Sequence, residues 1–208
     1  MTGGRWREKR TLADFGGPER LWPAERKLLD ERDTGLVVRV GDKRPGPDAP
    51  PDVRVRASFL RWLILGAEGA EGRTHEKGVR VEGAFIESDG PEGAGTRGLS
   101  LEGCAVAWGI ALFGCRFEDE PTFASARLEG LYLDRSHAPG LKADRLETRD
   151  NVHLRYGFES DGEIRLLGAR IGGTLSCTNA KLRNADGAAL NADNIATGGA
   201  VLLREGFA

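Results

Sequence analysis

Histidine and cysteine are the residue types in this chain best suited to acid–base, nucleophilic or metal chemistry, and there are 3 of each. His75, His137 and His153 fall at unrelated repeat positions, and the last two alternate with apolar neighbours so that their side chains should face solvent. A catalytic histidine needs a partner within hydrogen-bond reach, and the sequence offers only Asp134 or Asp144 near His137. We therefore expect surface histidines and no catalytic residue.

The cysteines do not have the spacing of ligands or of a disulfide framework. Cys104, Cys115 and Cys177 are odd in number and lack a CxxC or Cys/His motif, which argues against a zinc site. They occupy positions expected to point into the core, where a thiol is a small apolar group that reacts slowly. The chain has no GxxxxGK[ST] loop and no GxGxxG between a strand and a helix. We predict no metal site and no cofactor.

The composition indicates a folded chain without a strong electrostatic preference. Of the 208 residues 39% are hydrophobic and 30% are charged, as in ordinary globular proteins. The formal net charge of −2 gives no general attraction to nucleic acid or to anionic lipid. The N-terminus lacks a signal-peptide pattern, and the most apolar stretch, Phe59 to Leu65, is too short to span a bilayer. We expect a soluble cytoplasmic protein with no nucleic-acid partner and no membrane insertion.

A repeat dominates the second part of the chain. Apolar or small residues recur at relative positions 1, 3, 6 and 8 of segments that begin at Val79, Leu99, Ile110, Pro121, Leu131, Ile164 and Leu175. A longer period is superimposed, because Leu141–Leu146 returns as Leu190–Ile195 and Val152–Phe158 as Val201–Phe207, an offset of 49 residues in both cases. Self-similarity at a fixed spacing is typical of stacked units that cannot bury their apolar faces alone.

Each repeat consists of two units of five residues with a strand-like alternation. One outward residue separates two inward ones, which is the period of an extended chain and not of a helix. Glycine can supply the turn conformations that a Cβ would penalise, and it closes several units, at Gly83, Gly103, Gly114, Gly130, Gly168 and Gly173. The chain is therefore predicted to be mainly β, with short strands wound around an apolar interior.

This pattern resembles the pentapeptide-repeat family, in which a small inward residue is followed two positions later by a large apolar one. The pattern is shared by the pairs Ala126/Leu128, Ala169/Ile171, Ala180/Leu182, Cys104/Val106 and Cys115/Phe117. The resemblance covers roughly residues 79–208 and implies a right-handed quadrilateral parallel β-helix. Many family members have Asp or Asn between the two inward residues, whereas this chain has Arg116, Arg127, His137, Arg170 and Lys181. The resemblance therefore extends to the fold but not to a partner.

Two further motifs, LLGARIGG and GAALNAD, resemble those of a group of uncharacterised bacterial proteins labelled as membrane-associated oxidoreductases. That resemblance implies a bacterial protein. No residue of this chain supports a redox activity, so the label is not carried over.

The chain is expected to have two parts, a helical N-terminal cap with a Pro-rich loop over residues 1–74 and a β-solenoid over residues 75–208. A solenoid has open ends whose apolar interior and strand edges must be covered. A separate helical module on a flexible linker is the alternative interpretation. Within the solenoid, Glu87–Thr96 and Arg183–Ala188 interrupt the repeat and are expected to project as loops.

Four elements are predicted within the cap. Pro23 suits the first turn of a helix that continues to about Arg32. A short strand over Leu36–Val40 and a loop over Gly41–Asp52 follow. Val53–Leu65 is expected to form a second helix, apolar nearly all round, which would lie across the first coil.

The C-terminal end is predicted to be an association surface. The sequence reaches Ala208 in the middle of a repeat, so either the natural chain continues or another molecule covers this end. Members of the pentapeptide-repeat family often dimerise end to end. The resemblance therefore implies a homodimer with a twofold contact through Ile195, Val201, Leu203 and Phe207.

The sequence favours a non-catalytic protein-interaction scaffold or adaptor that binds a protein partner or its own copy. One alternative is an enzyme with a site between the solenoid face and the helical cap. Another is an inhibitor that imitates DNA, which would need an acidic face. Here basic outward residues alternate with acidic ones, so the electrostatic field of the outer face largely cancels. The acidic residues are Glu82, Glu102, Glu118, Glu129 and Asp134.

Overall fold

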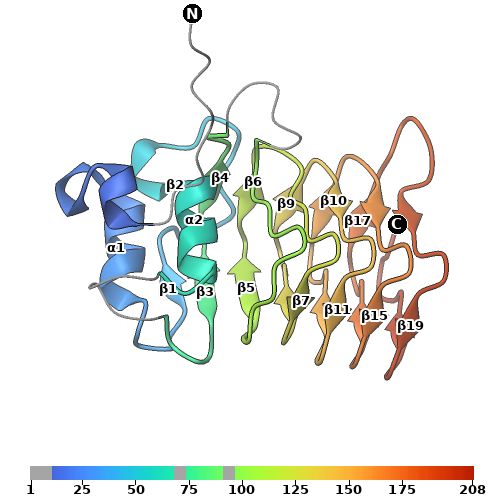
Figure 1. Ribbon diagram of the computed structural model, residues 1–208. Coiled ribbons are helices and arrows are strands. Elements are labelled where there is room, and N and C mark those ends of the chain that lie inside the picture. Colours follow the sequence, from blue (N-terminus) through green and yellow to red (C-terminus); the bar gives the residue numbers. More distant parts are fainter. Residues whose placement is uncertain (1–10, 68–73, 91–96) are drawn as a thin grey trace, which may run out of the picture.

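The computed structural model describes residues 11–67, 74–90 and 97–208, and in this part of the chain short parallel strands form four sheets. The sheets extend along one axis, with the helices at one end and the C-terminus at the other (Figure 1). This arrangement fits a β-solenoid in which each turn of the chain, here called a coil, adds strands to successive sheets. No helix of the described part is long and apolar enough to cross a bilayer.

Two of the sheets run almost the whole length of the solenoid. Sheet A has the strand order β1 (Val38–Arg39), β3 (Val79–Glu82), β5 (Ile110–Phe113), β8 (Leu131–Tyr132), β12 (Val152–His153), β16 (Leu175–Ser176) and β20 (Val201–Leu202). Sheet B has the order β2 (Arg54–Arg56), β4 (Phe85–Glu87), β6 (Arg116–Phe117), β9 (His137–Ala138), β13 (Glu159–Ser160) and β17 (Lys181–Leu182).

The other two sheets are shorter and lie among the later coils. Sheet C has the order β10 (Leu141–Lys142), β14 (Ile164–Arg165) and β18 (Leu190–Asn191). Sheet D has the order β7 (Arg127–Leu128), β11 (Glu147–Thr148), β15 (Arg170–Ile171) and β19 (Ala196–Thr197). Neighbouring strands in a sheet come from successive coils, so the fold is built from one local pattern repeated along the axis.

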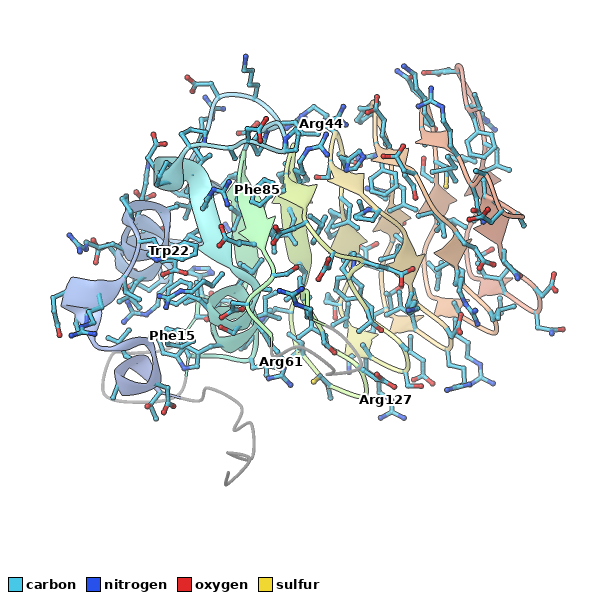
Figure 2. The ribbon with its side chains drawn as sticks, turned by 90° about the horizontal axis from the view of Figure 1, so that it is seen from above. Phe15, Trp22, Arg44, Arg61, Phe85 and Arg127 are labelled. Carbon is cyan, nitrogen blue, oxygen red and sulfur yellow. The ribbon has the colours of Figure 1, made fainter. Side chains whose placement is uncertain are left out.

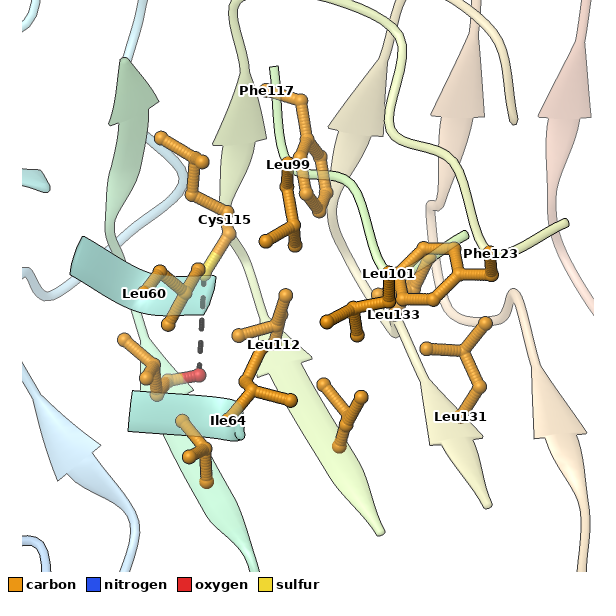
Figure 3. Close-up of a cluster of buried hydrophobic side chains, with 14 of the residues drawn as sticks. Leu60, Ile64, Leu99, Leu101, Leu112, Cys115, Phe117, Phe123, Leu131 and Leu133 are labelled. Atoms are coloured by element: carbon orange, nitrogen blue, oxygen red, sulfur yellow. Dashed lines mark hydrogen bonds between the residues drawn. The ribbon is translucent and has the colours of Figure 1, made fainter. Parts of the chain in front are cut away.

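The strand register aligns residues of the same type in neighbouring strands. In sheet A, Leu131 pairs with Val152 and Val152 pairs with Leu175, which places three apolar side chains in one inward column. The inward positions predicted from the repeat are buried, including Leu101 and Leu166 at 0% exposure and Phe117 at 2%. Figure 3 shows part of this core, in which Leu60 and Ile64 from the helical end join side chains of the first coils. The predicted inward alternation is confirmed.

The corners between strands use the left-handed conformation more widely than the glycine pattern predicts. Gly83, Gly103, Gly114 and Gly168 have positive φ as expected, whereas Gly130 and Gly173 do not. Positive φ angles of 54° to 62° also occur in the solenoid at Ser125, Arg135, Arg145, Tyr156, Asn179, Asn194 and Glu205. This conformation costs a residue with a Cβ roughly 1–2 kcal/mol. Hydrogen bonds between coils offset the cost, as from Arg135 N to Arg155 O at 2.9 Å.

Two α-helices lie at one end of the solenoid, opposite the end with the C-terminus (Figure 1). They are α1 (Pro23–Glu31) and α2 (Ala57–Ile64), and short 3-10 turns lie at Leu12–Phe15, Pro18–Arg20 and Pro51–Val53. In α2, Phe59, Leu60, Leu63 and Ile64 are each at most 1% exposed, because the helix packs on more than one side. The second predicted helix therefore exists, and its apolar side chains are buried, whereas Ser58 and Arg61 are partly exposed.

The start of that helix differs from the prediction, because Arg54–Arg56 forms strand β2. Val55 points inward with 0% exposure, and β2 pairs with β4 in sheet B. The apolar run after Ala57 is helical, but the alternation before it is that of a strand. The predicted strand over Leu36–Val40 is present as β1 and pairs with β3 in sheet A. Residues before the repeat thus supply strands as well as helices, and a boundary at residue 75 stays a prediction.

Candidate functional site

His137 is not the surface histidine that the alternation predicts. Its residue is 7% exposed, and its Nε2 lies 2.7 Å from Asp161 Oδ2 while its Nδ1 lies 3.1 Å from Arg116 Nη1. Since a guanidinium can only donate, Nδ1 accepts from Arg116 and Nε2 carries the proton donated to Asp161. The prediction of Asp134 or Asp144 as the hydrogen-bond partner of His137 is wrong. The true partner comes from the next coil.

A segment of the Pro-rich loop explains this burial. Arg44 donates to Glu159 Oε2 at 2.6 Å and to Gly157 O at 3.0 Å, and Arg116 Nε donates to Pro45 O at 2.9 Å. The loop is therefore fastened across strands β6 and β13 of sheet B, with His137 between them. Both ring nitrogens of His137 are engaged, so this cluster anchors the loop and has no free base for catalysis.

The other two histidines also make contacts that stabilise the local structure. His75 Nδ1 accepts a hydrogen bond from Lys77 N at 3.0 Å and closes a turn. The His153 ring lies edge-on to Tyr132, with centroids 5.1 Å apart, and its Nδ1 is buried without a hydrogen-bond partner. Burial, followed by the charge of Arg155, lowers the pKa of His153, so the ring is neutral at neutral pH. Of the three histidines, His137 has both ring nitrogens engaged, and His153 has its ring packed on Tyr132.

The cysteines divide into two buried thiols and one half-buried thiol. Cys115 and Cys177 are both 0% exposed, and burial raises the pKa of each to about 12. Cys104, also predicted to point inward, is half-buried, and Arg61 Nη2 lies 3.5 Å from its Sγ. Only this cysteine departs from the buried inward position. All three thiols are free, and the described residues contain no group of three metal-binding side chains.

This division predicts selective alkylation. At about pH 8 a thiol with a pKa of about 12 is a thiolate in roughly one molecule in ten thousand, and burial slows the reaction further. Iodoacetamide should therefore modify Cys104 at least about a hundredfold faster than Cys115 or Cys177 in the native protein. Peptide mass spectrometry over a time course measures the three rates, and denatured protein is the control in which the three converge. Equal native rates for Cys104 and Cys115 would contradict the burial.

A groove of about 860 Å³ lies along sheet D. Its rim carries Arg127, Glu147 and Arg170 from successive coils, with Glu147 3.1 Å from Arg127 and 3.6 Å from Arg170. Figure 2 shows Arg127 on the opposite side of the solenoid from Arg44. The small residues along the groove are Ala105, Ala107, Gly172, Ala196 and Gly198. Arg149 and Glu129 also line the groove, so its lining carries three arginines and two glutamates, a formal net charge of +1.

Ion pairs between neighbouring coils neutralise charges elsewhere on the outer faces as well. Arg155 pairs with Asp134 at 2.8 Å, and Arg165 pairs with Asp144 at 2.8 Å. Lys142 and Glu120 form a similar pair at 2.6 Å. These carboxylates therefore meet a cation on a neighbouring coil and do not build up a negative stripe.

A smaller hollow of about 500 Å³ lies on sheet A near the helical end. Three aromatic side chains line it, those of Trp108, Phe113 and Tyr132. Arg80 also lines it, and its Nε is buried without a hydrogen-bond partner. The repeat pattern pointed to none of these residues, because each occupies an ordinary outward or corner position.

The four predicted interface residues all lie in the last coil. Val201 is 48% exposed and Leu203 is 44% exposed, whereas Ile195 and Phe207 are partly buried against the core. The register pairs Val201 with Leu175, which is 1% exposed. Val201 is thus an inward residue left uncovered at this end.

Comparisons with known proteins add no homologue to this description. A scan against models of protein families found no match, and searches of curated proteins and of solved structures found no similar protein.

Proposed function

We propose that this chain is a rigid, non-catalytic interaction scaffold, and that a second copy binds end to end at its C-terminal coil. In this proposal the solenoid is a right-handed quadrilateral β-helix of the pentapeptide-repeat type, capped by its N-terminal helices. The observation that carries it is the exposure of the last inward residues. Leu203 is 44% exposed, whereas Cys177, in the equivalent position one coil earlier, is fully buried.

The contrast between the two ends supports a contact at this place. At the first coil, α2 closes the interior and its apolar side chains are buried. At the last coil, strands β18, β19 and β20 each have a partner on one side only, since they end sheets C, D and A. An uncovered strand edge with apolar neighbours is a template for association. Contact with another chain would pair the free strand edges and bury the exposed apolar side chains.

A second copy suits this surface because a twofold axis presents the same edge and the same apolar residues to each other. Val201 and Leu203 would form the centre, and Ile195 and Phe207 would lie beside them. The three free cysteines support a reducing, cytoplasmic setting. A different protein at the same end is one alternative, and further chain beyond Ala208 that covers this end is the other. The compensated charges of the outer faces do not favour imitation of DNA, and the fully engaged His137 does not favour an enzyme.

The oligomeric state tests the proposal. Sedimentation velocity over a range of concentrations should show a dimer for the unaltered chain. The Val201→Asp/Leu203→Asp double variant places two charges in the contact and should raise the dissociation constant at least about a hundredfold, or ~2.7 kcal/mol. Leu36→Asp is the matched control, because Leu36 is also exposed, at 68%, but precedes β1 at the other end.

The outcomes distinguish self-association at the C-terminal coil from a chain that does not associate there. A dimer that the control retains and the double variant loses, with unchanged circular dichroism, supports the proposal. A chain that stays monomeric at high micromolar concentration overturns self-association, and so does a dimer that the double variant retains.

A further inference from the structure

The hollow on sheet A arises from one small residue in an outward row. The register of β3, β5 and β8 aligns Arg80 with Ala111 and Ala111 with Tyr132. Because Ala111 ends at Cβ, a depression of about 500 Å³ remains between its larger neighbours. Trp108, from the corner before β5, and Phe113, from the end of β5, line it as well.

The aromatic walls are held in place by hydrogen bonds that face away from a ligand. Trp108 Nε1 donates to Ile64 O at 3.1 Å, and the Tyr132 hydroxyl donates to Asp150 Oδ2 at 2.6 Å. The polar atoms of both rings are therefore used. What they offer to the hollow is ring surface, which packs well against another flat ring.

Arg80 supplies the planar cationic group of the lining. Its Nε is buried and has no hydrogen-bond partner. Nearby arginines differ, because Arg39 and Arg135 both pair with Glu82 at 3.0 Å. Since the Nε has almost no accessible surface, a ligand would meet the terminal nitrogens of the guanidinium, and this planar group matches a carboxylate best.

The carboxylates at the border limit the charge of a ligand. Glu129 lies 3.7 Å from Arg149, and Glu76 lies 3.6 Å from His75 and is 89% exposed. Both line the hollow without pairing with Arg80 in the described structure. Lys77 also lines the hollow, so the lining carries two cations and two carboxylates, and the carboxylates would repel a dianion such as phosphate more than a monoanion.

We propose that this hollow binds a small aromatic carboxylate, with its ring against Trp108, Phe113 and Tyr132 and its carboxylate on Arg80. The site is independent of the end-to-end contact, since it lies on the outer face near the helical end. It would give the scaffold a small-molecule ligand in addition to a protein partner.

Calorimetric titration of the full chain tests this site with three probes: benzoate, 4-hydroxybenzoate and indole-3-carboxylate. At least one should bind saturably at millimolar concentration or below, and the corresponding amide should bind at least about tenfold more weakly. Arg80→Gln should weaken the carboxylate about tenfold or more without changing the affinity for the amide. Ala111→Leu fills the hollow and should abolish binding of both.

Arg127→Gln is the matched control, because it removes an outward arginine from sheet D and should leave binding unchanged. Thermal unfolding of each variant confirms that the fold is retained. Absence of saturable binding for all three carboxylates overturns the proposal. Equal binding of acid and amide, or full binding by Ala111→Leu, also overturns it, because either result removes the role of Arg80 or of the hollow.

Discussion

Replacing Glu25 with alanine is expected to lower the free energy of unfolding by about 3–5 kcal/mol, because it leaves a nearly buried cation without its partner. The Glu25 residue is 0% exposed, and its carboxylate accepts hydrogen bonds from Arg56 Nε at 2.8 Å and from Arg56 N at 3.0 Å. It also accepts a bond from Trp22 N at 3.1 Å. A second guanidinium nitrogen of Arg56 donates to it as well, so one carboxylate satisfies four donors.

This pair joins the helical end to the first coil. Glu25 lies on α1 and Arg56 ends β2, so the bond links elements 31 residues apart. The Arg56 guanidinium also stacks over Trp22 at 5.0 Å and over Phe15 at 5.2 Å. Figure 2 shows Phe15 and Trp22 together at the helical end of the molecule. Loss of Glu25 should therefore loosen the contact between α1 and β2 as well as lower the free energy of unfolding.

Urea denaturation followed by circular dichroism measures the effect. Glu147→Ala is the control, because its pair with Arg127 is exposed on both sides, at 40% and 69%, and should contribute less than about 1 kcal/mol. Equal losses of stability for Glu25→Ala and Glu147→Ala would show that the buried pair does not fasten α1 to β2.

Replacing Phe158 with alanine is the second change with a large expected effect, a loss of about 3–5 kcal/mol. Phe158 is 0% exposed and belongs to the core. Its backbone bonds remain, since Phe158 N donates to Arg155 O at 3.1 Å and Lys181 N donates to Phe158 O at 2.9 Å. The variant therefore keeps the corner and leaves a cavity between coils, which the rigid stack cannot collapse to fill.

The nearby Tyr156 provides the control for this prediction. Tyr156 is 52% exposed and has a φ of 55°, a conformation that tyrosine and alanine adopt at similar cost. Tyr156→Ala should lose less than about 1 kcal/mol, mainly from its contact with Arg155. Equilibrium unfolding in urea compares the two variants. A Phe158→Ala loss no larger than that of Tyr156→Ala would contradict tight packing at this position.

The pattern of buried residues could be predicted because it is local. In the segment that begins at Leu131, the inward residues Leu131, Leu133 and Ala138 are all 0% exposed, as the alternation required. A strand places every second side chain on one face whatever its neighbours are. Cys104 departs from this pattern, as do the inward residues of the last coil. The structure places Arg61 of α2 beside its sulfur, a neighbour that the repeat cannot indicate.

The features that could not be predicted depend on residues far apart in the chain. Arg54–Arg56 reads as the start of a helix, and it is a strand because β4, about 31 residues later, offers an edge with which Arg54 pairs at Phe85. Likewise His137 pairs with Asp161 because consecutive coils bring residues 24 positions apart into contact. The Pro-rich loop across sheet B adds the burial.

The sequence by itself determined which side chains face the interior and that the chain winds into a repeating β structure, because a five-residue alternation constrains the backbone locally. Only the tertiary structure decided which coils touch, which loop covers sheet B and where Arg80 and Ala111 leave a hollow. These depend on the register between coils, and register is set by the packing of the whole stack.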